Sequence, residues 1–593
     1  MSPDHLFARA LARHGAGDLD GAIADYRALI VILPQEVAPL ANQAAAMLAR
    51  GRASEAAHLS RHLIRLAPEL ALAHRLAGES QALLADADAA RQSYRRAWLL
   101  QPDAAETANN FANFCSAEGD AQALRLYRHA VFLDPDRCEG YANLSAFLLT
   151  REQPRESVAA ARAAVALAPD NKAGWNNLGN ARFEQRDYDG ALGAFGRARR
   201  IAPYFADACI NEGGLLLDLG RAEEGGALSR QAVALVPDRR DAYNNLGNGE
   251  LLACRLDSAE RVFRHALAID PADAQTRFNF SSVLLKKGAL GEGWREYEWR
   301  RRTKAALRRV RSDDPPDWPG GDPAGRTLLL SAEQGFGDAL QFCRFAPWLA
   351  AKGAKVTLRT HAELVTLMRS LAGVAEVIGP AQAGTGAEFH LPLMSVPAAF
   401  ALDLDAIPAE VPYLHADAIA LLAWRRRLDA LPGLTVGLAW SGDPRPGQRS
   451  AHLLDQRRSM ALRHFAFLRE VAGITLVSLQ KGAPALEQAV PGAPTLIDWT
   501  GELHDFADSA ALLAALDLVI TVDTAVAHLA GALGRPVWIL SRFDGCWRWL
   551  EGRADSPWYP TARLFRQVRP GDWSEPLAEI ARAFTRRLPG SVP

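Results

Sequence analysis

The pattern of apolar and polar positions changes near residue 302 of this 593-residue chain. Before that point, apolar residues recur at helical spacing, and a proline closes each apolar segment after 33 or 34 residues. These prolines are Pro34, Pro68, Pro102, Pro135, Pro169, Pro203, Pro237 and Pro271. A regular period of this length predicts stacked helix pairs, each of which buries its apolar face on the next. Residues 1–302 are therefore expected to form one α-solenoid.

Within the period, the same small and aromatic residues return. Gly179 and Phe195 in one repeat correspond to Gly247 and Phe263 two repeats later. This pattern resembles the tetratricopeptide repeat, which implies a superhelix with a concave groove lined by the first helix of each pair. The last unit lacks the closing proline but is rich in aromatic residues, namely Phe280, Trp294, Tyr297 and Trp299. We expect this unit to dock on the second half of the chain.

An asparagine occupies one position of the period in most repeats. The series is Asn42, Asn109, Asn143, Asn177, Asn211, Asn245 and Asn279. Each amide offers a donor and an acceptor, which suits the backbone of an extended acceptor peptide. Alternatively, each amide bonds the backbone of its own repeat and fixes helix packing. The series from Asn109 onward also resembles the asparagine ladder of O-linked N-acetylglucosamine transferases, which implies a protein partner.

Residues 303–326 form a linker, because four prolines in it disfavour regular structure. They are Pro315, Pro316, Pro319 and Pro323. Short apolar runs then alternate with helical segments, which is typical of α/β folds with parallel sheets. Strands are expected at 327–332, 356–359, 374–378, 389–391, 435–440, 475–479, 518–522 and 537–540, and helices at 339–352, 418–428 and 576–587. This predicts two Rossmann-like lobes, 327–415 and 416–593, with a ligand between the carboxyl edges of their sheets.

The stretch from residue 517 to 536 predicts an anion site. A β-branched strand ends at Asp523, Thr524 suits the N-cap of the following helix, and the amides of Ala525 and Val526 lack partners within that helix. The helix dipole adds positive potential at the same place. The alternative is a buried strand and helix that bind nothing.

Three segments together resemble the heptosyltransferase-related glycosyltransferases of the GT-B fold. They are the V-D-T-A-V-A-H-L-A-G-A-L-G-R-P run that begins at Val522, the G-L-A-W-S-G run that begins at Gly437, and the G-F-G-D run that begins at Gly335. Combined with the repeats, they resemble bacterial repeat-containing protein glycosyltransferases, among them flagellin glycosyltransferases that attach nonulosonic acids. The resemblance implies a tetratricopeptide superhelix followed by a GT-B domain with an acceptor lobe and a donor lobe.

The candidate catalytic base is Asp338, which follows a Gly-x-Gly turn at the end of a strand, and Glu333 is the second candidate. Alternatively, Asp338 caps the helix after it. Beside the turn at residues 523–526, Arg458 is expected to bring a cation to the donor phosphate, and His528 is either a further donor or a packed core residue. The remaining candidates for donor binding are Gly335, Gly337, Trp440, Ser441, Gly442 and Gln480. Four aromatic residues, Trp547, Trp549, Trp558 and Tyr559, are expected either to pack in the core or to stack on the nucleotide base or sugar of the donor.

Composition narrows the choice of partners. A net charge of −1 disfavours nucleic acid, and the six cysteines show no metal-ligand spacing. The chain shows neither a leader-like start nor a long apolar span, so a cytoplasmic protein is expected. The catalytic half has one D-x-D run, Asp403 to Asp405, in an expected loop, so no metal or other cofactor is expected.

These observations and resemblances together predict an inverting, metal-independent glycosyltransferase. It would transfer a sugar from a nucleotide donor to a serine or threonine of a protein held by the repeats. The resemblance implies flagellin as acceptor and a CMP-nonulosonate as donor, with UDP-N-acetylglucosamine (UDP-GlcNAc) as the second donor. The alternative is a non-catalytic repeat scaffold whose second half binds nucleotide sugar or nothing.

Overall fold

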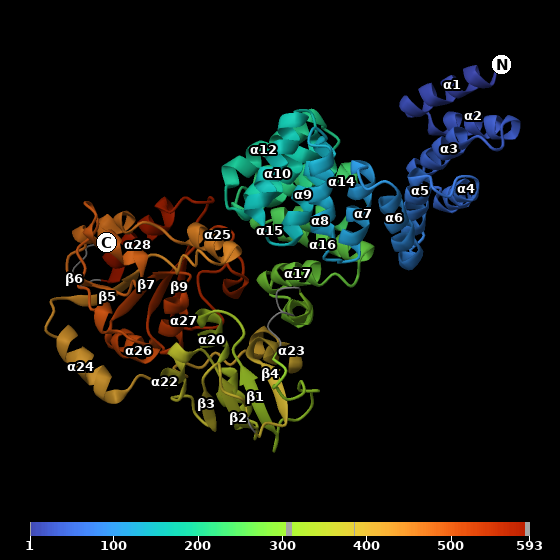
Figure 1. Ribbon diagram of the computed structural model, residues 1–593. Helices are drawn as coiled ribbons and strands as arrows, with labels where there is room; N and C mark the ends of the chain where they lie inside the picture. The colour runs from blue at the N-terminus through green and yellow to red at the C-terminus, as the bar shows by residue number, and fades with distance from the viewer. Residues whose placement is uncertain (1, 304–310, 385, 588–593) are drawn as a thin grey trace. The chain divides into compact units, whose positions relative to one another are not determined.

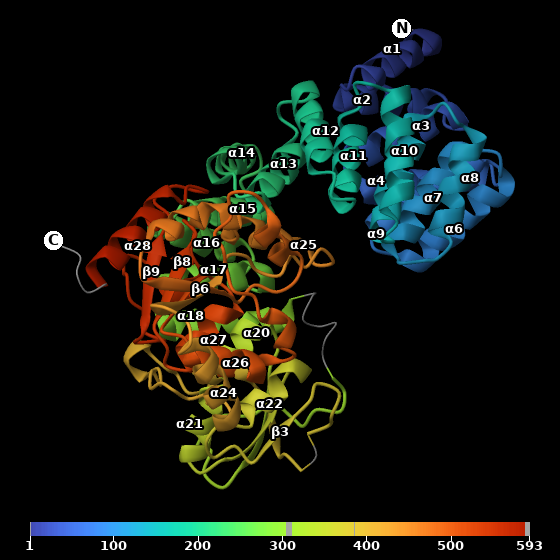
Figure 2. The ribbon, with the colours of Figure 1, turned by 90° about the vertical axis from the view of Figure 1, so that its left-hand side faces the viewer.

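The computed structural model describes residues 2–303, 311–384 and 386–587 (Figure 1). The chain divides into two compact units, one up to Leu215 and one from Leu216 onward. This division differs from the expected boundary at residue 302, because the last repeats belong to the same unit as the two sheets. Figure 2 shows the same elements from the side.

The first unit consists of helix pairs, and from α1 to α12 each helix contacts the next. Its helices are α1 (Pro3–Gly15), α2 (Leu19–Ile32), α3 (Val37–Ala49), α4 (Ala53–Leu66), α5 (Ala71–Leu83), α6 (Ala87–Leu100), α7 (Ala105–Ala117), α8 (Ala123–Leu133), α9 (Cys138–Thr150), α10 (Pro154–Leu167), α11 (Lys172–Glu184), α12 (Tyr188–Ile201) and the start of α13 (Ala206–Asp218). The expected α-solenoid is confirmed.

Two recurring residues shape each helix pair. Gly179 of α11 lies against the Phe195 ring of α12, so that any side chain at this position would overlap the ring. The residue before each closing proline leaves the helix: Ala202, for example, has a φ of −135°. A residue before proline disfavours helical geometry, which explains why the second helix of each pair ends there.

The second unit begins with the remaining repeat helices. They are α14 (Ala222–Leu235), α15 (Arg240–Leu252), α16 (Leu256–Ile269), α17 (Ala274–Lys286), α18 (Leu290–Tyr297) and the 3-10 helix η1 (Glu298–Arg302). The expected docking of the aromatic last unit is confirmed. Trp294 packs edge-on against Trp547, with 5.3 Å between ring centroids. The hydroxyl of Tyr297 lies 3.7 Å from the sulfur of Met394.

The N-terminal lobe has a four-stranded parallel sheet in the order β3-β2-β1-β4. Its elements are β1 (Thr327–Ser331), α20 (Phe336–Phe342), α21 (Phe345–Ala351), β2 (Lys355–Arg359), α22 (Val365–Met368), β3 (Glu376–Ile378), β4 (Phe389–Pro392), η3 (Leu393–Ser395) and α23 (Val396–Ala399). The linker also contributes, because the amide of Trp318 donates to the carbonyl of His390 on the edge strand β4. Part of the expected linker, 304–310, lies outside the described residues.

One expected helix, 339–352, is wrong as a single element. The structure has two helices, α20 and α21, separated at Cys343 and Arg344. Pro347 lacks the amide hydrogen that a continuous helix would donate to the carbonyl of Cys343, which accounts for the break. The helix also begins earlier than expected, so that Asp338 lies in its first turn and not before it.

The C-terminal lobe has a five-stranded parallel sheet in the order β6-β5-β7-β8-β9. Its elements are α24 (Ala418–Leu428), β5 (Leu434–Ala439), α25 (Arg449–Arg458), η5 (Leu462–Glu470), β6 (Ile474–Ser478), α26 (Phe506–Ala515), β7 (Leu518–Val522), α27 (Ala525–Ala532), β8 (Val537–Ser541), η8 (Trp547–Trp549), β9 (Ala562–Arg566) and α28 (Ser574–Arg587). The edge strand β9 was not expected from the sequence. The fold class, a repeat superhelix followed by two α/β lobes, is confirmed.

The β-branched strand β7 is buried on both faces, as a central parallel strand should be. Leu518 and Ile520 share a core cluster with Phe584 of α28. Val519, which points to the other face, shares a cluster with residues of α26 and α27. The two layers of helices in Figure 1 therefore follow from the alternation of side chains along the strand. The contacts of Val519 hold α27 against the sheet, with the start of this helix at the carboxyl end of β7.

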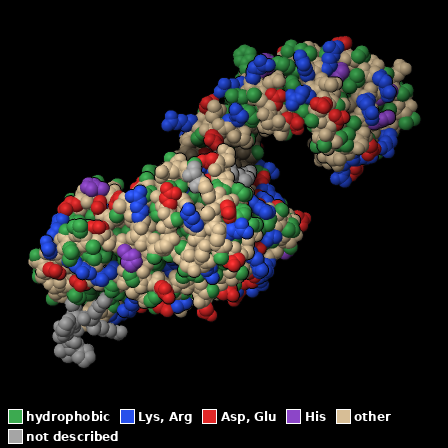
Figure 3. Space-filling model, turned by 90° about the horizontal axis from the view of Figure 1, so that it is seen from below, with side chains coloured by type: hydrophobic (Ala, Val, Ile, Leu, Met, Phe, Trp, Pro, Cys, Tyr) green, Lys and Arg blue, Asp and Glu red, His purple; other side chains and the backbone are tan. Residues whose placement is uncertain are grey.

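Charged side chains of both signs are interspersed on the face shown in Figure 3, as the net charge of −1 would suggest. Within the described part of the chain, every helix is too short or too polar to cross a membrane. All six cysteines are free thiols.

Candidate functional site

The turn between β7 and α27 leaves helix amides open. Thr524 takes the N-cap position with an extended φ of −133°, but its side chain makes no capping bond to the helix. Its hydroxyl instead lies 3.2 Å from the hydroxyl of Thr521. The amides of Ala525 and Val526, the first of the helix, have no partner within it and lie in half-buried residues. This end of α27 can bind an anion.

Arg458 lies beside this turn and is held there by two bonds. Its Nη1 donates to the carbonyl of Asp523 at 2.9 Å, and its Nε donates to the Asp455 carboxylate at 2.9 Å. The guanidinium passes directly over Gly442, where a side chain would overlap both Arg458 and Asp455. The glycine therefore gives Arg458 access to the turn. The structure brings these predicted residues together at the carboxyl ends of β5 and β7.

The loops after β5 and β6 are joined by Gln480. Its side-chain oxygen accepts from the amides of Trp440, at 3.1 Å, and Ser441, at 2.9 Å. Gln480 and Trp440 are both buried. As placed, these two residues hold the shape of the loop, and only Ser441 is partly exposed.

The G-F-G-D turn of the N-terminal lobe meets the same end of α27. Gly337 lies against the ring of His528, and a side chain at Gly337 would approach it to 2.9 Å and Ala525 to 3.7 Å. Gly335 is the N-cap of α20, and its amide donates to Asp338 at 3.0 Å. The absence of a side chain at Gly337 thus allows the two lobes to approach closely. The candidate base and the candidate anion site lie on adjoining elements.

Asp338 is ion-paired as well as capping its own helix. Its second carboxylate oxygen accepts from Arg548 of η8, in the other lobe. The Nε of Arg548 donates to Gln341 at 2.6 Å, and its guanidinium lies over the Trp547 ring. Burial disfavours the charge on Arg548, but the Asp338 carboxylate outweighs this effect and the pKa of Arg548 is raised. Arg548 was not expected from the sequence; its place between two tryptophans is the one local signal that could have indicated it.

Glu333, the second candidate base, is paired with a different arginine. The Nη2 of Arg300, a buried residue of η1, donates to Glu333 at 2.7 Å and to the hydroxyl of Ser395 at 2.7 Å. Arg300 also pairs with Glu298. Arginines from outside the N-terminal lobe therefore hold both carboxylates that follow β1.

His528 packs the junction between the lobes. Its ring is buried and stacks on Trp549, with centroids 5.4 Å apart, and its Nδ1 lies 3.0 Å from the hydroxyl of Tyr559. Burial lowers the pKa of His528 to about 4, so the imidazole is neutral near pH 7. The described contacts fit the packed-core alternative, not a charged donor to phosphate. Trp549, Trp558 and Tyr559 are fully buried and belong to the same core.

The asparagines of the repeat all lie on the first helix of a pair and are half-buried. Most of the amide nitrogens bond the preceding repeat. Asn143 donates to Asn109 at 3.1 Å, Asn177 to the carbonyl of Ala142 at 2.9 Å, Asn211 to Asn176 at 3.0 Å, and Asn279 to Asn244 at 3.0 Å. The ladder thus connects successive repeats, whereas Asn42 fits the own-repeat alternative, because its amide donates to the carbonyl of Ala38 at 3.0 Å. Arg75 interrupts it on α5, where it pairs with Glu79.

Comparison with known proteins adds to this geometry. A family model described as glycosyltransferase family 9 (heptosyltransferase) matches residues 485–540, which include β7, α27 and all but the last residue of β8. Protein FlbA of Caulobacter vibrioides is 26% identical over 521 residues, which are 83% of this chain and 80% of that protein. Protein O-mannosyl-transferase TMTC3 of Mus musculus is 26% identical over 129 residues, 19% of this chain and 14% of that protein.

Solved structures with similar folds include the APC/C hetero-tetramer Cut9–Hcn1. That match has a TM-score of 0.40 and 18% identity, and it covers 45% of this chain and 52% of the other. The family match falls on the segment where the anion site was expected. The chain thus combines helix pairs that resemble tetratricopeptide repeats with an α/β half that matches a glycosyltransferase family model over residues 485–540.

Proposed function

We propose that this chain is a protein O-glycosyltransferase that moves a sugar from a nucleotide donor to a serine or threonine of a protein held by its repeats. One observation carries the proposal: Gly337, next to Asp338, adjoins Ala525 at the open end of α27. The proposed base and the proposed anion site therefore belong to adjoining elements from two lobes. Transfer to an alcohol needs both, because the acceptor loses a proton as the phosphate leaves.

In the proposed reaction, Asp338 takes the proton of the acceptor hydroxyl. The acceptor oxygen forms a bond to the anomeric carbon while the bond from that carbon to the donor phosphate breaks. The phosphate oxygen takes the electron pair and is stabilised by the α27 amides and by Arg458. Attack opposite to the leaving group inverts the configuration. Since helix amides and Arg458 supply the positive potential, we propose that no metal or other cofactor is required.

The ion pair between Asp338 and Arg548 must open before Asp338 can act as a base. Arg548 belongs to the C-terminal lobe and Asp338 to the N-terminal lobe. A movement of one lobe against the other would therefore free the carboxylate. We propose that donor binding between the lobes causes this movement, since domain closure and opening commonly accompany such reactions.

The finer identities are also proposals. We propose a CMP-nonulosonate as donor and UDP-N-acetylglucosamine as the second choice, with flagellin as the acceptor; the resemblance of the combined repeats and catalytic half supports these. We propose a cytoplasmic location, since six free thiols suit a reducing compartment.

The test is intact-mass analysis of flagellin co-expressed with the full chain and a supply of sugar nucleotide. A mass increment that disappears with Asp338→Asn supports the proposal, and the increment identifies the sugar. For capture of the acceptor, the combined substitution Asn177→Ala, Asn211→Ala and Asn245→Ala should weaken pull-down of flagellin. Thermal unfolding of the variant must be measured in parallel, because Asn177 and Asn211 also bond the preceding repeat.

A non-catalytic scaffold is the second candidate, and one observation favours it. Asp338 is neutralised by Arg548 and occupied as a helix cap. Titration of the full chain with CMP- and UDP-nucleotides separates the candidates. An absence of binding to either nucleotide would favour the scaffold.

A further inference from the structure

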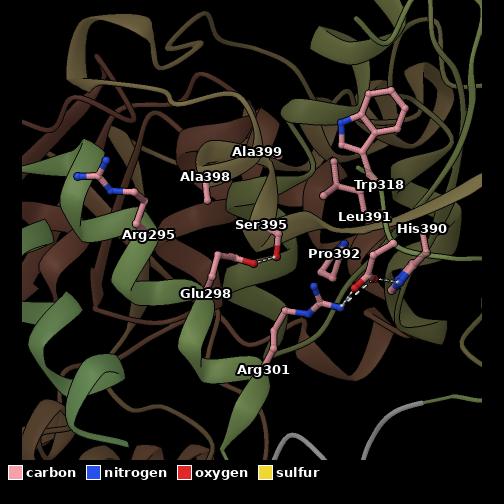
Figure 4. A pocket seen from close by; sticks show the side chains of 11 residues that line it. Arg295, Glu298, Arg301, Trp318, His390, Leu391, Pro392, Ser395, Ala398 and Ala399 are labelled. Atoms are coloured by element: carbon pink, nitrogen blue, oxygen red, sulfur yellow. Dashed lines mark hydrogen bonds and ion pairs between the residues drawn. The ribbon is translucent and has the colours of Figure 1, made fainter. Parts of the chain in front are cut away.

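A cavity of about 350 Å³ opens beside the end of the last repeat, apart from the anion site. One side is formed by α18 and η1, the other by β4, α23 and the linker residues that pair with β4. Figure 4 shows Glu298, Ser395, Arg301 and His390 converging around Pro392. All of these elements belong to the second compact unit.

The lining combines an apolar floor with charges at the edge. Leu391, Pro392, Ala398 and Ala399 form the floor, and the indole of Trp318 stands at one side. Glu298 already accepts from Ser395 at 2.8 Å, and Arg301 pairs with Asp317 at 2.7 Å. These charges are satisfied internally.

Arg295 is different from the other charged residues of the lining. It is exposed on α18 and has no ion pair or hydrogen bond with any described residue. Glu298 is paired with Arg300 and Arg301 with Asp317, so Arg295 is the arginine of the lining that has no acidic partner among the described residues, and it stands next to an apolar floor. This combination suits an apolar side chain that has an acidic neighbour.

The cavity is connected to the carboxyl end of β1. The Nη2 of Arg300 bonds both Ser395, which lines the cavity, and Glu333, which follows β1. One guanidinium therefore separates the cavity from the loop that leads to Asp338. A chain segment bound in the cavity would therefore be connected through Arg300 to the loop that leads to the proposed base.

We propose that this cavity is a subsite for the acceptor protein, where an apolar side chain near the modified residue binds and an adjacent acidic residue pairs with Arg295. The inference rests on the proposed function, because it names the class of acceptor sequence that the transfer site would take. A volume of about 350 Å³ leaves room for an apolar side chain together with part of the neighbouring acceptor backbone.

The test uses the full chain without any donor and two capped pentapeptides. One has the sequence glycine-aspartate-leucine-serine-glycine, and the other has lysine in place of aspartate. Binding is followed by ligand-observed NMR titration. The acidic peptide should bind, and binding should weaken about tenfold or more with Arg295→Glu, which removes the charged partner, and with Ala399→Trp, which fills the cavity. The lysine peptide should gain affinity for Arg295→Glu.

The matched control is Arg463→Glu, an exposed charge reversal on η5 that should leave binding of the acidic peptide unchanged. Equal binding of this peptide to the wild type and both cavity variants would overturn the inference, as would no binding at all. Binding of free N-acetylglucosamine that Ala399→Trp abolishes would make the cavity a saccharide site instead.

A separate titration with CMP- and UDP-nucleotides distinguishes failure of this inference from failure of the proposed function. Peptide binding that depends on the cavity, without any nucleotide binding, would contradict the proposed function but keep the cavity as a peptide site.

Discussion

The two sides of the candidate site differ in how their charges are satisfied. On the donor side, the first amides of α27 have no partner within the helix, and Arg458 is held beside them by bonds to Asp455 and Asp523. On the acceptor side, Asp338 and Glu333 are each paired with an arginine. The donor side is therefore prepared for an incoming anion, whereas the acceptor side must release a charge first.

The two acceptor-side pairs are also unlike each other. Arg548, the partner of Asp338, comes from the other lobe, so relative movement of the lobes can separate them. Arg300, the partner of Glu333, is buried and bonds Ser395 and Glu298 as well. Opening the first pair also breaks the buried bond from Arg548 to Gln341, but both of these contacts join the two lobes and can part in one movement. This difference favours Asp338 as the base.

The largest effect is expected for Asp338→Asn. The amide can still accept from Gly335, so the helix cap is retained, but proton transfer is lost. The rate of sugar transfer should fall about 10²–10⁴-fold, the usual contribution of a general base. Initial rates by mass spectrometry at saturating acceptor would show this, with circular dichroism as a check of the fold. An undiminished rate would mean that Asp338 only caps α20.

Arg458→Gln tests the donor side. It removes the fixed cation beside Ala525 and Val526, and it should weaken nucleotide-sugar binding about 10–100-fold, the effect of losing a charged hydrogen bond. Calorimetric titration of the full chain measures this. Arg463→Gln, which removes an exposed charge on η5, is the control and should change little. If both variants bind donor like the wild type, α27 is not the phosphate site.

The sequence predicted most of the fold and half of the site. The 34-residue period and its prolines suffice to predict the repeats, because the end of each helix pair is determined locally. The residue before Pro203, for example, disfavours helical geometry. Strand β7 is equally clear, because burial on both faces demands an unbroken apolar run. Strand β9 was missed because it lies at a sheet edge, where its alternating sequence, A-R-L-F-R, is short and partly charged.

The site was predictable only where it is local in sequence. The α27 turn and the G-F-G-D turn can each be recognised from their own local sequence. The arginines that pair with the carboxylates cannot, because Arg548 lies 210 positions from Asp338 and Arg300 lies 33 positions from Glu333. Such pairings depend on how the lobes and the last repeat pack. No spacing in the sequence encodes them.

Glu333→Gln should affect stability more than activity. It removes one partner of the buried Arg300, which keeps Glu298 and Ser395, so the free energy of unfolding should fall by about 1–3 kcal/mol. Transfer should fall less than about tenfold, since Asp338 and not Glu333 is the proposed base. Thermal unfolding and transfer rates are measured on the same preparation. A loss of transfer as large as that of Asp338→Asn, with unchanged stability, would reverse the roles of the two carboxylates.

The smallest effect concerns His528, which connects the two sides by packing between Gly337 and Trp549. Its pKa of about 4 in the folded chain lies below the ordinary value of 6.5, chiefly because it is buried. The unfolded chain therefore binds more protons between these values, and stability present above pH 6.5 is lost as the pH falls toward 4. Between pH 7 and pH 5.5 the loss should be on the order of 1 kcal/mol.

His528→Phe keeps an aromatic ring on Trp549 but cannot titrate. The unfolding free energy of the wild type should therefore fall between pH 7 and pH 5.5 by more than that of the variant. If another group caused the loss, the unfolding free energies of both proteins would fall equally. Urea unfolding of both proteins at pH 7 and pH 5.5 measures the difference. Since the folded His528 ring stays neutral down to its pKa of about 4, donor binding by the folded chain should change equally in wild type and variant between pH 7 and pH 5.5.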